Sequence, residues 1–223
     1  MKLRYLICAA ALVMPFAAQA QGMNSASNGF SYNYVDLGYT RARFTTPRYT
    51  NPGAFSNSGY TVRASWLFLP NYFVKIGYQT AKWDHGVGTP PNTSAFKHTY
   101  ADLGIGARYG LARTLDAVAS VSALYEKVND NAGTNKNNTG ERVTAGFRIH
   151  PSARSHFELD TLLRYNWVKR GNTAYQHQLF RGDYMAVIGR AMYSFTRNVA
   201  VMVEYQNLDN ADFAWTGGFR VSF

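Results

Sequence analysis

The sequence predicts an all-β protein, a closed antiparallel transmembrane β-barrel with ten strands in preference to eight. Three observations predict this fold: apolar and polar residues alternate over many segments, aromatic residues are abundant, and short connections alternate with long ones. The last eleven residues, FAWTGGFRVSF, show the alternation most clearly, because Phe213, Trp215 and Phe219 share one parity while small or polar residues fill the other. Such a strand fits a wall between lipid and a polar lumen.

Ten segments alternate in this way, and each is long enough for a tilted strand to cross the apolar layer of a membrane. In 59–69, for example, Tyr60, Val62 and Trp66 fall on the outward parity. The predicted strands are 31–44, 59–69, 72–83, 98–109, 115–127, 142–149, 156–169, 183–195, 198–208 and 213–223. A soluble β-sandwich or lipocalin-like barrel is the alternative, and it would turn its apolar face inward instead.

The connections between these segments alternate in length. Those on the long side are rich in Gly, Asn, Pro and Thr, except for a short fifth one. The short connections fall at 71, 110–114, 151–155 and 196–197, and those on the long side at 45–58, 84–97, 128–141, 170–182 and 209–211. Outer-membrane barrels have short periplasmic turns and longer surface loops, so we expect both chain termini on the periplasmic side.

The composition agrees with a barrel and argues against a helical membrane protein. Hydrophobic residues make up 46% of the chain and aromatic residues 15%, with 16 Tyr and 14 Phe, which is typical of barrels with aromatic girdles. Beyond the N-terminal region there is no run of about 18 apolar residues, so the sequence predicts no membrane-spanning helix.

The N-terminal region has the pattern of a secretory signal peptide. Lys2 and Arg4 precede an apolar run at 6–17, and Ala18-Gln19-Ala20 fits a small-x-small cleavage site. Cys8, the single cysteine, would leave with the signal, so the mature chain would fold without disulfides. A retained membrane anchor is the alternative. We expect a signal peptide at 1–20 that is removed near Ala20, a short periplasmic segment at 21–30 and the barrel domain at 31–223.

The two ends of the predicted barrel also carry a family resemblance. The opening SYNYVDLGY, Ser31 to Tyr39, and the closing GFRVSF resemble a family of small proteobacterial outer-membrane β-barrels. The resemblance implies a Gram-negative outer-membrane protein whose terminal Phe223 is part of the signal read by the barrel-insertion machinery. It implies no catalytic residues. The loops here are neutral to basic, unlike the acidic loops of the family, so no shared partner is implied.

Charged residues on the inward parity predict an ion-paired lumen. Seven acids face eight bases there, and unpaired charges in a barrel interior would be costly. Ten strands should leave at most a narrow path, since wide aqueous channels need about 16. A selective pore with an arginine ladder is the alternative. The predicted network comprises Asp36, Arg63, Lys75, Asp102, Arg108, Asp116, Glu126, Arg142, Arg148, Glu158, Asp160, Arg164, Arg190, Glu204 and Arg220.

Further basic residues lie at the strand ends and in the loops on the outer side. Guanidinium and ammonium groups just above an aromatic girdle suit lipopolysaccharide phosphates, which they would hold by charge-assisted hydrogen bonds. An ordinary solvated rim is the alternative. The formal net charge of +10 does not indicate nucleic-acid binding, because the chain is expected to be exported and its charges are interleaved. The candidate lipopolysaccharide contacts are Arg41, Arg43, Lys82, Lys127, Lys169 and Arg170.

No arrangement of residues predicts an active site, a metal site or a cofactor site. Asp84 and His85 are adjacent, so strand geometry would point their side chains to opposite faces. Ser155-His156 falls at a predicted periplasmic turn. Glu158 and Asp160 share one face, where we interpret them as salt-bridge partners of Arg148 and Arg164 rather than as catalytic acids.

The sequence therefore predicts a monomeric, non-enzymatic outer-membrane barrel that contacts lipid and lipopolysaccharide. Its expected contribution is to envelope integrity or to surface contact through the loops. A narrow channel for small or ionic solutes is the alternative. A loop-side protease or lipid hydrolase is the less favoured third possibility.

Overall fold

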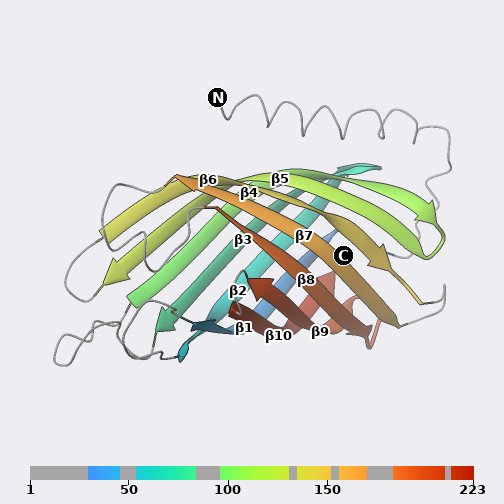
Figure 1. Ribbon diagram of the computed structural model, residues 1–223. Coiled ribbons are helices and arrows are strands. Elements are labelled where there is room, and N and C mark those ends of the chain that lie inside the picture. The colour runs from blue at the N-terminus through green and yellow to red at the C-terminus, as the bar shows by residue number, and fades with distance from the viewer. Residues whose placement is uncertain are drawn as a thin grey trace.

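The fold is a closed barrel of ten antiparallel strands (Figure 1). In the computed structural model, the described residues are 30–45, 54–83, 96–130, 135–151, 156–169, 183–208 and 212–223. The strands are β1 (Tyr34–Thr45), β2 (Ala54–Leu69), β3 (Tyr72–Trp83), β4 (Phe96–Ala112), β5 (Leu115–Asp130), β6 (Asn135–Ile149), β7 (Phe157–Lys169), β8 (Asp183–Ser194), β9 (Val199–Leu208) and β10 (Asp212–Ser222).

Each strand pairs with its neighbours in the sequence, and the ring closes between the first strand and the last. The register of β1 against β10 runs from Tyr34 opposite Ser222 to Arg43 opposite Phe213. Closure leaves no unpaired strand edge, which is the condition for a sheet to span hydrocarbon. The predicted closed antiparallel barrel and its count of ten strands are thus confirmed.

Several strands extend further toward the outer end than the sequence predicted. β6 begins at Asn135 rather than at 142, and β2 begins at Ala54 rather than at 59. Most of the loop expected at 128–141 is therefore paired strand, with Val128 opposite Lys136. The reason is physical: apolar alternation marks only the part of a strand that meets lipid, and these extensions carry polar residues.

The described connections lie at the end of the barrel that holds both Phe30 and Phe223. They are residues 70–71, 113–114, 150–151 with 156, and 195–198. Phe223 N donates to Asn33 O at 3.1 Å, which ties the two ends of the described chain together. The connections at the opposite end fall in 46–53, 84–95, 131–134, 170–182 and 209–211, outside the described residues.

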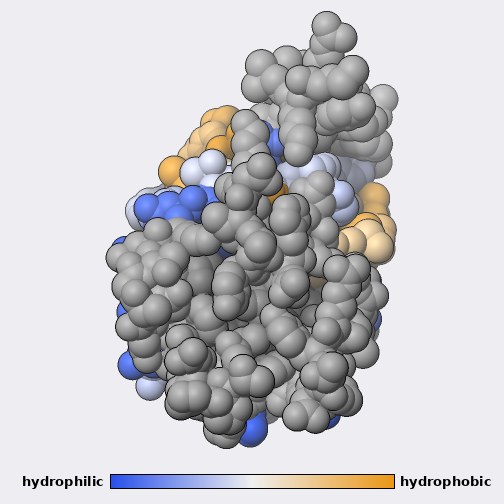
Figure 2. Space-filling model, turned by 60° about the vertical axis from the view of Figure 1, so that its left-hand side comes forward, coloured by the Kyte–Doolittle hydropathy of each residue, from blue (hydrophilic) through white to orange (hydrophobic). Residues whose placement is uncertain are grey.

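The outer wall is apolar, as the alternation predicts. Leu103 and Ile105 are each 59% exposed, and the exposed large hydrophobic residues occupy the outward parity of every strand. Figure 2 shows hydrophobic side chains (orange) on both flanks of the barrel with hydrophilic ones (blue) beside them. So large an apolar surface on a folded chain marks contact with lipid. Among the described residues there is no helix that is long and apolar enough to span a membrane.

Aromatic side chains border this apolar wall at both ends. Toward the outer end, the rings of Tyr205 and Trp215 lie 4.7 Å apart. Toward the end that holds the termini, the rings of Trp66 and Phe223 lie 5.9 Å apart. Two aromatic belts at the two ends of an apolar band are the usual arrangement of membrane barrels.

Candidate functional site

The lumen gathers the charged residues that the sequence placed on the inward parity, and every strand contributes at least one of them. Among them Asp36, Asp116 and Glu204 are almost completely buried. Successive residues of a strand point alternately to the outer wall and to the lumen. The alternation therefore places apolar side chains on the outer wall and charged side chains in the lumen. The lumen is therefore the candidate functional site.

Glu204 on β9 and Asp36 on β1 each bind guanidinium groups in the half of the lumen near the termini. Both oxygens of Glu204 accept from Arg63, at 2.5 and 2.7 Å, and Arg190 donates to it at 2.7 and 3.0 Å. Arg220 binds Asp36 in a two-pronged contact at 2.7 and 2.9 Å. Planar two-pronged contacts of this kind are the strong form of an arginine–carboxylate pair.

These pairs are linked through two acids on β7. Asp160 accepts from Arg190 at 3.2 Å and lies 3.5 Å from Arg148 Nε. Glu158 pairs with Arg148 and lies 3.9 Å from Arg220 Nη1. Arg63, Glu204, Arg190, Asp160, Arg148, Glu158, Arg220 and Asp36 thus form one continuous ion-pair chain. Arg148 and Arg190 contact the β7 acids, whereas Arg164, which the sequence suggested, donates to Gln206 Oε1 at 3.3 Å.

Three aromatic rings pack together in the lumen on the side of the termini, and we call Phe30, Tyr32 and Phe73 the aromatic plug. All three are buried and pack with Leu67 and Val118. The rings of Tyr32 and Phe73 lie 5.4 Å apart. The plug was not predicted from the sequence, because Phe30 precedes the first predicted strand. The signal was present, however, since Phe30 and Tyr32 continue the inward parity of β1 backward along the chain.

Polar contacts hold the plug in place. Tyr32 Oη donates to Asp116 Oδ2 at 2.9 Å, and the guanidinium groups of Arg148 and Arg108 lie 4.4 and 4.9 Å from the Tyr32 ring centre. Burial raises the pKa of the Tyr32 phenol above its usual value, which keeps it protonated as a donor. Asn33 Oδ1 accepts from Leu67 N at 2.7 Å. The segment 30–33 is therefore built into the barrel end.

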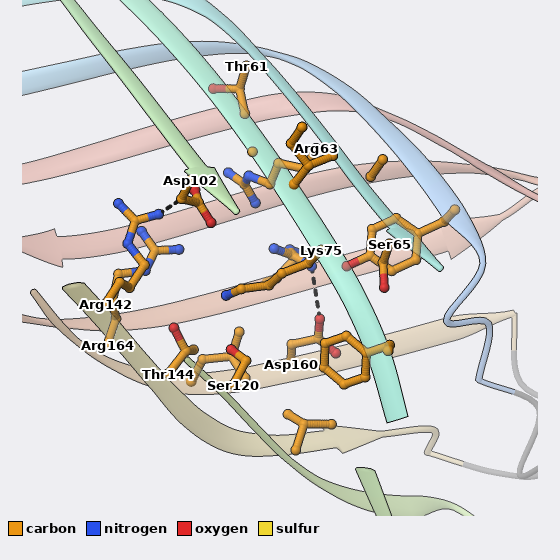
Figure 3. A pocket seen from close by; sticks show the side chains of 18 of the residues that line it. Thr61, Arg63, Ser65, Lys75, Asp102, Ser120, Arg142, Thr144, Asp160 and Arg164 are labelled. Carbon is orange, nitrogen blue, oxygen red and sulfur yellow. Dashed lines mark hydrogen bonds and ion pairs between the residues drawn. The ribbon is translucent and has the colours of Figure 1, made fainter. Parts of the chain in front are cut away.

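A cavity of about 130 Å³ lies between the plug and the outer end. Tyr32 and Phe73 line it on the plug side, and Gln79 and Tyr100 line it on the outer side. Its acidic lining residues are Asp102 and Asp160, and Figure 3 shows the side chains around it. The basic residues of the lining are Arg63, Lys75, Arg142, Arg148, Arg164 and Arg190.

Hydrogen bonds fix parts of the cavity wall. Arg142 donates to Asp102 Oδ1 and to Asn166 Oδ1, both at 2.7 Å. Gly77 lies beside Asp102, and a Cβ at this glycine would sit 2.5 Å from Asp102 Oδ1. Only a residue without a side chain leaves Asp102 room to meet Arg142.

A second polar cluster lies nearer the outer end. His98 Nε2 and Glu126 Oε1 are 2.8 Å apart, and Asn138 Nδ2 donates to Glu126 Oε2 at 2.8 Å. All three residues are buried. At the other end of the lumen, Arg108 Nη1 lies 3.8 Å from Asp116. With these, every member of the predicted lumen set is placed.

Four of the candidate lipopolysaccharide contacts have described side chains, and these lie on the outward face near the outer end. Arg41, Arg43 and Lys82 are exposed and Lys127 is half-buried. The side chain of Lys169 and the whole of Arg170 lie outside the described residues.

Strand register brings three basic residues into one row. Arg41 lies opposite Ser58, Ser58 opposite Lys82, and Lys82 opposite Lys97. We call Arg41, Lys82 and Lys97 the basic row. Sequence analysis omitted Lys97 from this set, because only the register of β3 against β4 shows that it faces Lys82.

The residues considered for catalysis do not meet in the described part of the chain. Asp84, His85 and Ser155 lie outside it, and His156 is exposed at a turn. Glu158 and Asp160 are engaged by arginines. The described residues hold no cluster of three His, Cys, Asp or Glu side chains placed to bind a metal.

No protein-family model matches this chain, and no curated protein matches it in sequence. Solved structures do match it. The NanC porin has a TM-score of 0.50 at 9% identity, covering 85% of this chain and 100% of its own. The translocator domain of the autotransporter NalP from Neisseria meningitidis has a TM-score of 0.50 at 12% identity, covering 97% of both chains. At such identities these likenesses show the fold alone, a transmembrane β-barrel.

Proposed function

We propose that this chain is a non-enzymatic outer-membrane β-barrel that contributes to envelope integrity and surface contact and does not carry solutes across the membrane. The observation that carries this proposal is the obstructed end of the lumen. There Phe30, Tyr32 and Phe73 pack into one buried cluster beneath a continuous ion-pair chain, and a space of about 60 Å³ remains at that end, lined among others by Ser31, His150 and Arg220. A solute path would have to pass both.

The ion-pair chain is a costly barrier to open. Separating one buried pair leaves an uncompensated charge, which costs about 3–5 kcal/mol. Glu204 binds both Arg63 and Arg190, so moving it would strand Arg63 and leave Arg190 with Asp160 alone. The segment 30–33, which carries two of the plug rings, is also bonded to the barrel: Tyr32 binds Asp116 on β5, Ser31 O accepts from Arg148 on β6, and Asn33 accepts from Leu67 on β2 and from Phe223.

Planar-bilayer recording of the purified barrel tests this proposal. We expect no steady unitary current from the native chain and measurable currents from the double variant F30A/Y32A, which removes two rings from the plug. The matched control is F68A/Y72A, whose rings lie 6.3 Å apart on the outer wall and should leave the protein closed. Steady unitary currents from the native chain would contradict the proposal.

For envelope integrity, we propose that the basic row and its neighbours hold lipopolysaccharide phosphates. The support is the register, which sets Lys82 directly opposite Lys97. Like charges directly opposite in a sheet, with Cβ atoms about 5 Å apart, destabilise it. A phosphate between the two ammonium groups would turn this repulsion into attraction. The proposed contacts are Arg41, Arg43, Lys82, Lys97, Lys127, Lys169 and Arg170.

Lipopolysaccharide retention during purification tests this part. Replacing the seven residues by Gln should lower the lipopolysaccharide that copurifies with the protein. The control replaces Arg113 and Arg197, which are exposed at the opposite end of the barrel. Equal retention in the native protein and the sevenfold variant would refute the contact while leaving the closed-lumen proposal intact.

A narrow channel for small ionic solutes is the second candidate, and the cavity favours it. A space of about 130 Å³ lined by basic groups would suit an anion that passes through the barrel. The recordings above decide between the two candidates, because a channel would conduct without any change to the plug.

A further inference from the structure

Lys75 on β3 projects into the lumen cavity without a counter-ion. In Figure 3 its side chain extends through the cavity, with Arg63 near one wall and Arg142 and Arg164 at another. Within the described part of the chain, Lys75 Nζ forms no hydrogen bond and no ion pair. Arg63 and Arg142, by contrast, each bind a carboxylate at 2.7 Å or closer. Lys75 is thus a half-buried ammonium group that faces open space.

The cavity wall as a whole is rich in cations. Six basic side chains line it, against the carboxylates of Asp102 and Asp160. Across the full lumen the two signs are nearly balanced, but Asp36, Glu158 and Glu204 are engaged on the side of the termini and do not line the cavity. Four of the six lining cations are paired, Arg63, Arg148 and Arg190 with acids of the ion-pair chain and Arg142 with Asp102, whereas Lys75 meets the open space without an ion pair to a described residue.

An unpartnered hydroxyl group in the cavity wall also indicates that the cavity can bind a hydrogen-bond acceptor. Thr144 on β6 is 8% exposed and lines the cavity, and its Oγ1 has no hydrogen-bond partner within the described residues. Thr144 lies opposite Arg164 in the β6–β7 register, so a hydroxyl and a guanidinium approach the cavity from neighbouring strands. A buried donor left unpaired costs free energy, as does an unpaired buried cation.

We propose that this cavity binds a small oxyanion of the phosphate or sulfate class. Lys75 would supply the principal charge from β3, with Thr144 and the guanidinium edges of Arg142 and Arg164 completing the site from β6 and β7. A tetrahedral oxyanion accepts hydrogen bonds from several directions at once, which matches donors placed on different walls. A volume of about 130 Å³ has room for such an ion. The bound ion would bridge the two walls of the lumen.

Titration of inorganic phosphate into barrel refolded without lipopolysaccharide, in detergent and at constant ionic strength, tests this site. We expect saturable binding by calorimetry and a rise in the unfolding temperature that saturates with it. K75Q should weaken the affinity at least tenfold, and K75R should retain most of it. K82Q is the matched control, because Lys82 lies on the same strand but faces outward at the rim, and it should bind phosphate like the native chain.

T144V provides a second variant that keeps the charge of the lumen, and it should weaken binding several-fold. If phosphate binding did not saturate when the chloride concentration is held constant, the effect of phosphate would be nonspecific charge screening. That result would overturn the proposal. Equal affinities of K75Q and the native chain would do so too. A loss confined to K82Q would place the phosphate at the rim instead and would equally rule out the lumen site.

Discussion

The half of the lumen near the termini and the half near the cavity contain similar charged residues. The two halves differ in how these charges are paired. Near the termini, Glu204 and Asp36 are each held by guanidinium groups, and three aromatic rings pack into a buried cluster beside them. Around the cavity, Asp102 is paired with Arg142 while Lys75 faces open space. The comparison teaches that an equal count of acids and bases does not give uniform neutralisation. Strand register decides which charges meet.

The largest expected effect comes from removing an acid in the closed half. Glu204→Gln should lower the free energy of unfolding by about 3–5 kcal/mol, because Arg63 and Arg190 then lose their shared buried carboxylate. Urea unfolding in detergent, followed by tryptophan fluorescence, measures the loss. Asp102→Asn, at the cavity wall, should cost clearly less, because solvent in the cavity can replace part of what Arg142 loses. Equal losses in both variants would remove the distinction between the halves.

A smaller effect should follow from one hydroxyl in the plug. Tyr32→Phe removes the donor to Asp116 and leaves the ring, so it should cost about 1.5–3 kcal/mol, the range for a hydrogen bond to a charged group. The same unfolding assay applies. Tyr60→Phe is the control, because the Tyr60 side chain is exposed on the outer wall and its change should be small. A cost for Tyr32→Phe no larger than that of the control would show that the plug hydrogen bond is not stabilising.

The packing of the cavity wall should respond to a single methyl group. Gly77→Ala would place a Cβ against Asp102 and push it from Arg142, at a cost of about 1–3 kcal/mol. At Gly217, nothing lies within 4 Å of an added Cβ. Gly217→Ala should therefore be neutral or stabilising by up to about 1 kcal/mol. Thermal unfolding of the two variants measures the difference in their stability. A Gly77→Ala variant as stable as the native chain would mean that Asp102 can move aside at no cost.

The smallest effect is expected at the rim, where cations meet solvent rather than a closed lumen. Lys97→Gln removes the like charge opposite Lys82 and should stabilise the barrel by about 0.2–1 kcal/mol in detergent without lipopolysaccharide. The gain should shrink as salt is added, because salt screens exposed charges. Unfolding midpoints at two salt concentrations test this, and a loss of stability at low salt would contradict it.

Period-two alternation was enough to predict the ten strands and their outward faces. It could not place the outer ends of β2 and β6, where strands continue on polar residues beyond the apolar layer. Parity also says which face a residue occupies but not which partner it meets. Arg164 was expected to pair with the acids of β7. Asp160 and Arg164 lie four positions apart on the same strand, which puts their Cα atoms roughly 13 Å apart. The register instead places Arg190 directly opposite Asp160.

The two stretches that carry the family resemblance lie side by side in the fold. Residues 34–38 of the opening motif pair with 218–222 of the closing one. Arg220 binds Asp36 and lies 3.6 Å from the Tyr34 ring centre, so each motif holds the other. The two stretches lie at opposite ends of the chain and become neighbours only through closure of the barrel.

The pairing of Asp36 with Arg220 has a consequence for assembly. The two residues are 184 positions apart, so a chain that emerges N-terminus first presents the acid long before its base has been made. Contacts between such distant positions form late, because the chain loses the entropy of closing a long loop before the contact can stabilise it. Until then the carboxylate cannot enter hydrocarbon without cost. We therefore expect this ion pair to form only when the final strand closes the ring.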